Sequence, residues 1–263
     1  MNKTQENIAA RIRIVMVGTQ HPGNLGAAAR AMKTMGLTRM VLVAPEKAPD
    51  FDTAAMAAGA EALVFDAPRF ATLQEAVADC QLVLGCTARS RRIALQEFAP
   101  PAAAQKILAA ADTGAEVALV FGRERTGLDN HELQLCHAAI HIPSVADFSS
   151  LNLAAAVQVL AYEVRMAILG GLSAEAGSAQ DSQEALQDAR ELPASHAELE
   201  GFFSQLADTL DAIDFHKGRT PESALRKLRR IFLRADMSVR EVRLMRGVLA
   251  DAQRMARLAG ERD

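Results

Sequence analysis

The feature that most constrains the fold is a regular alternation, from residue 12 to residue 170, of short apolar runs with alanine-rich segments of helical spacing. A run of four to six apolar residues is typical of a strand that is buried on both faces. Strands that alternate with helices predict an α/β unit, in which helices cover both faces of a parallel sheet. We expect its strands at residues 12–17, 40–44, 61–65, 82–86, 117–121 and 139–142.

Beyond the α/β unit the composition changes, which predicts a domain boundary. Gly, Ser, Ala and Gln dominate residues 171–196, where apolar anchors are rare, so we interpret this segment as a flexible linker. Residues 197–263 show helical spacing of apolar side chains, and Ser238 with Glu241 three positions later is a helix-start signal. We therefore expect an α/β domain over residues 1–170 and a small helical domain over residues 197–263.

The helical domain becomes strongly basic towards its end. From Lys217 onwards thirteen Lys or Arg residues stand against six Asp or Glu, a net charge of +7, whereas the whole chain carries only −3. Most of these cations are arginines, whose planar guanidinium suits contacts with phosphate. A solvated helical face would show the same excess, but here the excess continues through two helices. The pattern favours a nucleic-acid-binding surface.

Several other classes of protein are disfavoured by composition. The three cysteines stand at unrelated spacings, so neither a disulfide framework nor a zinc site is expected, and no His/Cys cluster has metal-ligand spacing. No apolar stretch approaches the roughly 20 residues that span a bilayer, and the first ten residues lack the apolar core of a signal peptide. We expect a cytoplasmic protein that binds no metal and no membrane.

Ligands of parallel sheets bind beyond the carboxyl ends of the strands, so the loops there are the candidate site. The first such loop, HPGNLGAAAR, carries Asn24 between two glycines and Arg30 one turn into a helix. Glycines let a ligand approach the backbone, and the first amides of a helix attract anions. Its glycines do not have the spacing of a dinucleotide fingerprint, which disfavours an NAD enzyme. Asn24 and Arg30 could also be a simple turn amide and a surface cation.

Three further loops complete the expected rim. The segment CTARSRR follows the fourth predicted strand, and three of its last four residues are arginines, which favours a nearby anionic ligand. The alternative is that the segment is only an exposed loop. The segment FGRERTG brackets charged residues with glycines, and its Glu124 could instead pair with a neighbouring arginine or a helix terminus. The segment IPSVADFSSLN leads into a helix, for which Asn152 could simply supply helix-start chemistry.

Taken together, these motifs resemble the SpoU branch of the SPOUT methyltransferases, and within it the TrmJ-type tRNA ribose methyltransferases. Three ordered segments carry the resemblance over about residues 12 to 170: HPGNLGAAARAMKTMG, LVFGRERTGL and IPSVADFSSLNLAAAVQVLAYEVR. The resemblance implies an α/β fold whose C-terminal part is threaded into a trefoil knot, a known exception to the rule that chains do not thread. It also implies a homodimer, with tRNA lying across both subunits and methylated on the ribose 2′-oxygen of nucleotide 32, a cytidine or a uridine.

The resemblance assigns roles to particular residues. S-adenosylmethionine would be bound by Thr87, Ala88, Gly122, Glu124, Ile142, Ser150 and Leu151. Catalysis would depend on Arg30, Asn24 and Asn152. We expect RNA contacts from Arg89, Arg91, Arg92, Arg123, Arg226, Arg229 and Arg230.

The expected reaction is displacement at the cofactor's methyl group by a ribose 2′-hydroxyl. Because arginine stays protonated in proteins, we interpret Arg30 as an electrostatic and orienting group and not as a base. Three alternatives stay open on the sequence: an rRNA 2′-O-methyltransferase, a catalytically silent RNA-binding homologue, and an unrelated nucleotide-binding α/β protein.

Overall fold

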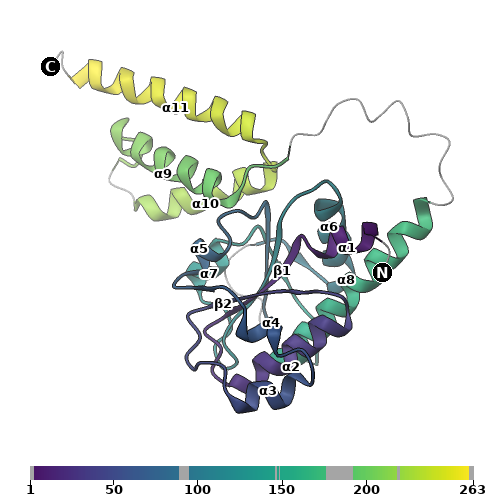
Figure 1. The fold of residues 1–263 in the computed structure, drawn as a ribbon. Helices are drawn as coiled ribbons and strands as arrows, with labels where there is room; N and C mark the ends of the chain where they lie inside the picture. The colour runs from purple at the N-terminus through teal and green to yellow at the C-terminus, as the bar shows by residue number, and fades with distance from the viewer. Residues whose placement is uncertain are drawn as a thin grey trace. The chain divides into compact units, whose positions relative to one another are not determined.

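The structure, a computed structural model, describes residues 3–88, 95–145, 147, 149–175, 192–217 and 220–260. Contacts within the chain divide it into two units, Met1–Arg190 and Glu191–Asp263, which are described one after the other. Figure 1 draws the chain from its N-terminus to its C-terminus.

The first unit is built on a parallel seven-stranded sheet, which confirms the predicted α/β class. Its strand order is β3-β2-β1-β6-β4-β7-β5, and every neighbouring pair in it is parallel. The apolar runs pack side by side in register, as Val15 does with Val41 on one side and Val120 on the other. The strands are β1 (Ile12–Val17), β2 (Arg39–Val43), β3 (Arg69–Phe70), β4 (Leu82–Cys86), β5 (Glu97–Phe98), β6 (Val117–Phe121) and β7 (Ala138–Ile140).

Helices cover both faces of this sheet (Figure 1). Alternate residues of a strand point to opposite faces, so Ile14 of β1 packs among α1, α2, α6 and α8, while Val15 packs with α5 and α7. Both faces of the central strands are therefore buried. The helices are α1 (Lys3–Ala9), α2 (Pro22–Thr34), α3 (Phe51–Ala57), α4 (Ala62–Phe65), α5 (Leu73–Ala76), α6 (Pro100–Asp112), α7 (Asn130–Gln134) and α8 (Leu153–Glu175).

One predicted strand is wrong. Residues 61–65, expected as a strand, form the short helix α4, in which Phe65 N donates to Glu61 O. A four-residue apolar run fits a buried helix turn as well as a strand, and periodicity cannot separate the two. The edge strands β3 and β5 were not predicted, because two residues are too few to show any alternation.

The strand order brings the candidate loops together. After β4 the chain forms β5 at the edge of the sheet, returns to place β6 between β1 and β4, and then places β7 between β4 and β5. The carboxyl ends of β1, β6, β4 and β7 are consequently neighbours, although three of these strands are far apart in sequence. This order is consistent with the threaded C-terminal part that the resemblance implies.

The last helix of the first unit, α8, differs from expectation in two ways. It continues to Glu175, into the segment predicted as linker, whose residues 176–191 lie outside the described residues. It also contains a stretch, Leu153–Gly170, that is by length and composition long and apolar enough to cross a membrane. Half of that stretch is buried within the unit, as is usual for the core helix of an α/β fold.

The second unit contains three described helices, α9 (His196–Ala212), α10 (Pro221–Ala235) and α11 (Val239–Gly260). Its core is small and apolar and centres on Phe202, Leu206 and Leu249. The predicted start of α11 is confirmed, since Ser238 and Glu241 bond each other's backbone amides. The unit begins before residue 197, because Ala194 is buried in this core and its amide donates to Met237 O.

Candidate active site

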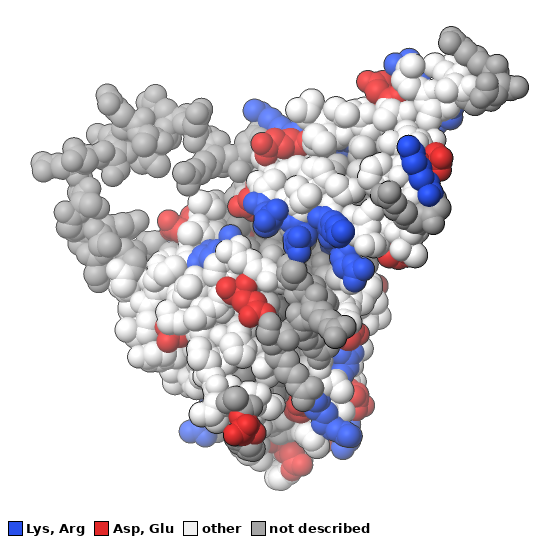
Figure 2. All heavy atoms as spheres, turned by 180° about the vertical axis from the view of Figure 1, so that it is seen from behind, with Lys and Arg blue, Asp and Glu red and all other residues white. Residues whose placement is uncertain are grey.

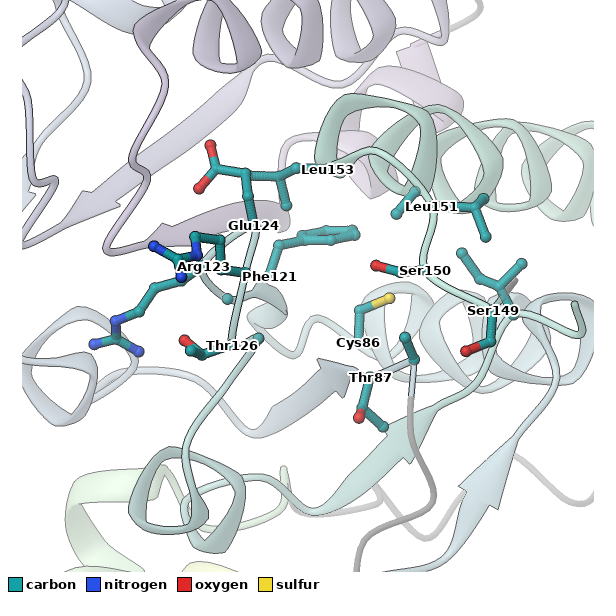
Figure 3. A pocket seen from close by; sticks show the side chains of 16 residues that line it. Cys86, Thr87, Phe121, Arg123, Glu124, Thr126, Ser149, Ser150, Leu151 and Leu153 are labelled. Carbon is teal, nitrogen blue, oxygen red and sulfur yellow. The ribbon is translucent and has the colours of Figure 1, made fainter. Parts of the chain in front are cut away.

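A pocket opens where β4, β6 and β7 end. All seven residues predicted to bind a cofactor line it, namely Thr87, Ala88, Gly122, Glu124, Ile142, Ser150 and Leu151. In Figure 3 the side chains of Cys86, Phe121 and Ser150 face one shared space, between the loop that carries Glu124 and the loop that leads into α8. The topology thus gathers residues from three separate stretches of the chain.

Gly122 makes the loop after β6 possible. The loop folds back on itself through two backbone bonds, Arg123 N to Gly127 O at 3.3 Å and Gly127 N to Arg123 O at 2.8 Å. A Cβ at Gly122 would stand only 2.2 Å from the backbone carbon of Gly127, and backbone cannot move aside as a flexible side chain can. The pocket wall therefore requires glycine at this position.

Glu124 ties this loop to the start of α2. Its carboxylate accepts from the backbone amides of Gln20 at 2.9 Å and His21 at 3.1 Å, and from Asn24 Nδ2 at 2.9 Å. Burial acts to raise the pKa of Glu124, but these hydrogen bonds outweigh burial and lower the pKa. The carboxylate is therefore ionised at neutral pH, and it serves a helix terminus, one of the two roles that the sequence left open.

Asn24 and Asn152 continue the same chain of hydrogen bonds. Asn152 Nδ2 donates to Asn24 Oδ1 at 3.0 Å, while Asn152 Oδ1 accepts from Ala154 N at 2.9 Å and so caps α8. Glu124, Asn24 and Asn152 thus link the loop after β6, the start of α2 and the start of α8. The sequence left open whether Asn152 only starts a helix or belongs to the site. The two are compatible, because its Oδ1 caps α8 while its Nδ2 donates to Asn24.

Arg30 is not brought to the pocket within one chain. It is exposed on α2, and it is absent from the residues that line the pocket. Of the three residues predicted to be catalytic, the structure joins Asn24 and Asn152 and leaves Arg30 apart.

Two of the predicted RNA-binding arginines have partners inside the protein. Arg123 donates to both carboxylate oxygens of Glu132 at 3.0 Å, and Arg229 pairs with Glu200 and lies over the ring of Phe203 at 4.5 Å. Their guanidinium groups are thereby held within the fold, which favours a structural role for both. Glu132 itself was missed, although the spacing of Asp129 and Glu132 is a helix-start signal that could have identified it.

The remaining predicted RNA contacts fall into two groups. Arg226 and Arg230 are exposed on α10, and Figure 2 shows Lys and Arg side chains gathered on the helical unit. Arg89, Arg91 and Arg92 lie outside the described residues.

The pocket lining combines apolar walls with charged side chains, namely the carboxylate of Glu124 and the guanidinium groups of Arg123 and Arg125. Burial raises the pKa of the Cys86 thiol to about 12, so this lining residue stays protonated and cannot act as a nucleophile at neutral pH. Arg123 is neutralised by Glu132. Within the part of the chain that the structure describes, no group of three or more His, Cys, Asp or Glu could hold a metal ion.

Comparison with known proteins agrees with this geometry. Residues 11–162 match the SpoU rRNA Methylase family, and residues 197–261 match the tRNA methyltransferase TrmJ C-terminal domain. The chain is 44% identical to the tRNA (cytidine/uridine/adenosine-2′-O-)-methyltransferase TrmJ of Pseudomonas aeruginosa, over 94% of this chain and 95% of that protein. It is 45% identical to the tRNA (cytidine/uridine-2′-O-)-methyltransferase TrmJ of Salmonella typhimurium, over 92% and 96%.

Solved structures give the same result. The crystal structure of TrmJ from Z. mobilis superposes with a TM-score of 0.75 at 32% identity, covering 91% of this chain and 97% of that one. A probable methylase family protein from Haemophilus influenzae superposes with a TM-score of 0.60 at 37% identity, covering 95% and 99%. Since the first family match spans more than half of the sequence and the relatives align over nearly all of it, this chain belongs to the SpoU methylase family.

Proposed function

We propose that this protein transfers a methyl group to the ribose 2′-oxygen of tRNA, at nucleotide 32 of the anticodon loop. The observation that carries the proposal is the pocket after β4, β6 and β7, whose lining residue Glu124 is bonded in a chain with Asn24 and Asn152. The named activities of the 44–45% identical relatives support tRNA as the substrate. The match of the helical unit to a TrmJ-specific domain supports it independently of the pocket.

The pocket suits S-adenosylmethionine, the methyl donor of this family. When bound, this cofactor supplies an electrophilic methyl group on a sulfonium. Backbone at Gly122, Ile142 and Leu151 offers uncharged donors and acceptors for the edges of a flat base. The thiol of Cys86 and the ring of Phe121 add apolar walls. The ionised carboxylate of Glu124 in the same lining suits a ligand whose reactive centre is positive.

The polar residues bonded to Glu124 position the ribose. Asn24 and Asn152 are fixed by each other and by Glu124, so their amide groups can hold the 2′-hydroxyl in line with the methyl group without reorganising. Arg30 stabilises the negative charge that develops on the 2′-oxygen, while the proton leaves to phosphate or water. The bond that forms is between the 2′-oxygen and the methyl carbon, and the bond that breaks joins that carbon to sulfur.

A second copy of the chain completes the site in this proposal. Exposed residues lie along one side of α8 from Asn152 through Ala155, Tyr162 and Met166, at spacings of three, seven and four residues, which keep to one helix face. Pairing of two such faces buries this apolar surface next to Asn152 and provides a route for Arg30 to come from the partner chain. Met166→Glu would place a charge in that interface. It should turn dimers into monomers in sedimentation measurements and abolish transfer, and an unchanged sedimentation coefficient would contradict the proposal.

RNA is held by charge in this proposal. The exposed arginines of α10, with Arg89, Arg91 and Arg92, would contact phosphates of the anticodon stem-loop. The enzyme would work in the cytoplasm, in keeping with three cysteines at unrelated spacings.

The decisive experiment is methylation of unmodified tRNA, with the modified nucleotide located by mass mapping. Arg30→Ala should lower kcat by about 100- to 1,000-fold, the range for removal of one group that stabilises an oxyanion. Calorimetric binding of S-adenosylmethionine should not change. Arg69→Ala removes another exposed arginine and is the matched control.

Other outcomes would contradict the proposal. Near-normal transfer by Arg30→Ala at saturating cofactor and RNA would remove the assigned role. Methylation of rRNA fragments in preference to tRNA would favour the rRNA alternative. Cofactor and RNA binding without any transfer would favour a catalytically silent homologue.

A further inference from the structure

Helix α3 is locked against the start of α2, beside the proposed ribose site. Thr53 Oγ1 donates to Pro22 O at 3.1 Å, and a Cβ on Gly26 would stand only 2.1 Å from Thr53 O. Asp50 caps α3 through a reciprocal pair of bonds with Thr53. The first turn of α3 is therefore held at a fixed place relative to Asn24, which is itself hydrogen-bonded to Asn152.

This fixed turn displays an aromatic ring to solvent. Phe51, the first residue of α3, is 84% exposed, and Met56 on the same helix is 52% exposed. Aromatic residues make up only 4% of the sequence. Exposure of a phenylalanine ring forgoes the free energy of burying it, and the rigid support gives no conformational freedom in return. A ring held in this way is suited to stacking against a base.

An open depression lies along this face of α3. It encloses about 510 Å³ and is lined by His21, Gly23, Asn24, Asp52, Ala55, Met56 and Asn152. Phe51 is not one of these lining residues, but it precedes Ala55 by one helical turn and so lies on the same side of α3, at the edge of the depression. Asn24 and Asn152 belong to this depression and also to the hydrogen-bonded chain that includes Glu124.

The lining indicates what kind of group fits. Among the described residues that line it there is no Lys or Arg, whereas the exposed carboxylate of Asp52 is present, so a phosphate would be repelled. A nucleobase has flat apolar faces and N–H donors on its edge. A carboxylate is a suitable acceptor for such a donor, as it is for the amino group of cytosine.

We propose that this depression binds the base of the methylated nucleotide, turned out of the RNA, with Phe51 and Met56 against its faces and Asp52 accepting from its edge. The inference rests on the proposed function, because it places the base on one side of Asn24 and Asn152 and the cofactor on the other. Phe51 is here a residue that binds substrate by stacking, an interaction open to any base.

The test is a cycle that combines a protein variant with a change in the RNA. Full-length enzyme is assayed on an unmodified anticodon stem-loop and on the same RNA lacking only the base of the target nucleotide. With the base present, Phe51→Ala should raise KM for RNA about tenfold to a hundredfold, the range for loss of one base–aromatic stack. On the abasic RNA the penalty should vanish, and KM for S-adenosylmethionine should stay constant throughout.

Further variants sharpen the cycle. Phe51→Trp keeps a stacking ring and should retain KM near that of the natural enzyme. Asp52→Ala should lower kcat/KM about threefold to tenfold with the base present, and not on abasic RNA. Phe65→Ala is the matched control, because Phe65 is 45% exposed on α4 and lies outside the depression.

Three results decide against the inference or separate it from the proposed function. An equal penalty for Phe51→Ala on both RNAs would overturn the inference. So would a changed sedimentation coefficient for this variant, since Phe51 would then lie in a subunit interface. A natural enzyme that methylates no tRNA would contradict the proposed function itself, before any variant is compared.

Discussion

The rim of the pocket and the basic surface of α10 hold their polar side chains in opposite ways. At the rim, Glu124, Asn24 and Asn152 are bonded to one another and to the backbone, so each has essentially one position. On α10 no described residue is buried, and Arg226 and Arg230 extend into solvent. Chemistry on a ribose needs fixed geometry, whereas attraction to phosphates needs only charge. Substitutions in the two regions should therefore fail in different ways.

The largest effect is expected at Gly122. Gly122→Ala should weaken S-adenosylmethionine binding more than about 100-fold, because its Cβ would overlap the backbone of Gly127 and open the loop. Calorimetry measures this directly. Gly247→Ala is the control in the other unit, where no atom lies within 4 Å of the new Cβ. It should leave cofactor binding intact and stabilise α11 by about 0.5–1 kcal/mol. Equal behaviour of the two variants would remove the distinction between the regions.

Arg229 lies on the basic helix α10, but its contacts hold it in one position, as the contacts of the rim residues hold theirs. Arg229→Ala should lower the free energy of unfolding of the second unit by about 2–3 kcal/mol, because Glu200 loses its charged partner and Phe203 its cation–π contact. Chemical denaturation followed by circular dichroism measures the loss. A variant as stable as the natural protein, but weak in RNA binding, would return Arg229 to the RNA-binding set.

Its exposed neighbours should show the reverse pattern. The double variant Arg226→Ala/Arg230→Ala should unfold at the same denaturant concentration as the natural protein and bind the anticodon stem-loop about tenfold more weakly. The slope of log affinity against log salt concentration should become shallower by about 2, one unit for each lost phosphate contact. Filter binding at several salt concentrations gives both values. An unchanged slope would show that these arginines do not contact phosphate.

A smaller effect is expected from pH. His196 is buried at the start of α9, and burial lowers its pKa, opposed by the charge of Glu200 and assisted by that of Arg229. The unfolded chain therefore takes up this proton at a higher pH than the folded one does. The second unit should therefore lose stability as pH falls below the unfolded value of about 6.5. Thermal unfolding between pH 8 and about 5.5 measures this, and His196→Leu should flatten the dependence.

Much of the first unit could be predicted from the sequence because its strands are buried on both faces. Strands β1, β4 and β6 begin and end at the predicted residues, since their runs are apolar except for Arg13 in β1 and Gly85 in β4. The error at residues 61–65 arose because such a run was too short for its period to be measured. The convergence of the loops followed from the rule that ligands bind at the carboxyl ends of strands. The seven expected cofactor-binding residues came from the family resemblance, and all seven line the pocket.

What could not be predicted depends on contacts between distant residues. Glu124 meets Asn24 a hundred positions away, and Arg229 meets Glu200 across two helices. No local pattern distinguishes an arginine that will find such a partner from one that will face solvent. The exposure of Phe51 is a fact of the same kind, because a phenylalanine at a helix start is expected to be buried.

The position of β6 between β1 and β4 has a consequence for synthesis. A growing chain that has made only its first four strands carries one of the three stretches that line the pocket, and the lining is completed only when the start of α8 has emerged. A product that ends before α8 therefore has no complete site in which to hold the donor. Placing late-made segments in the middle of the sheet makes synthesis as far as α8 a condition for any reaction.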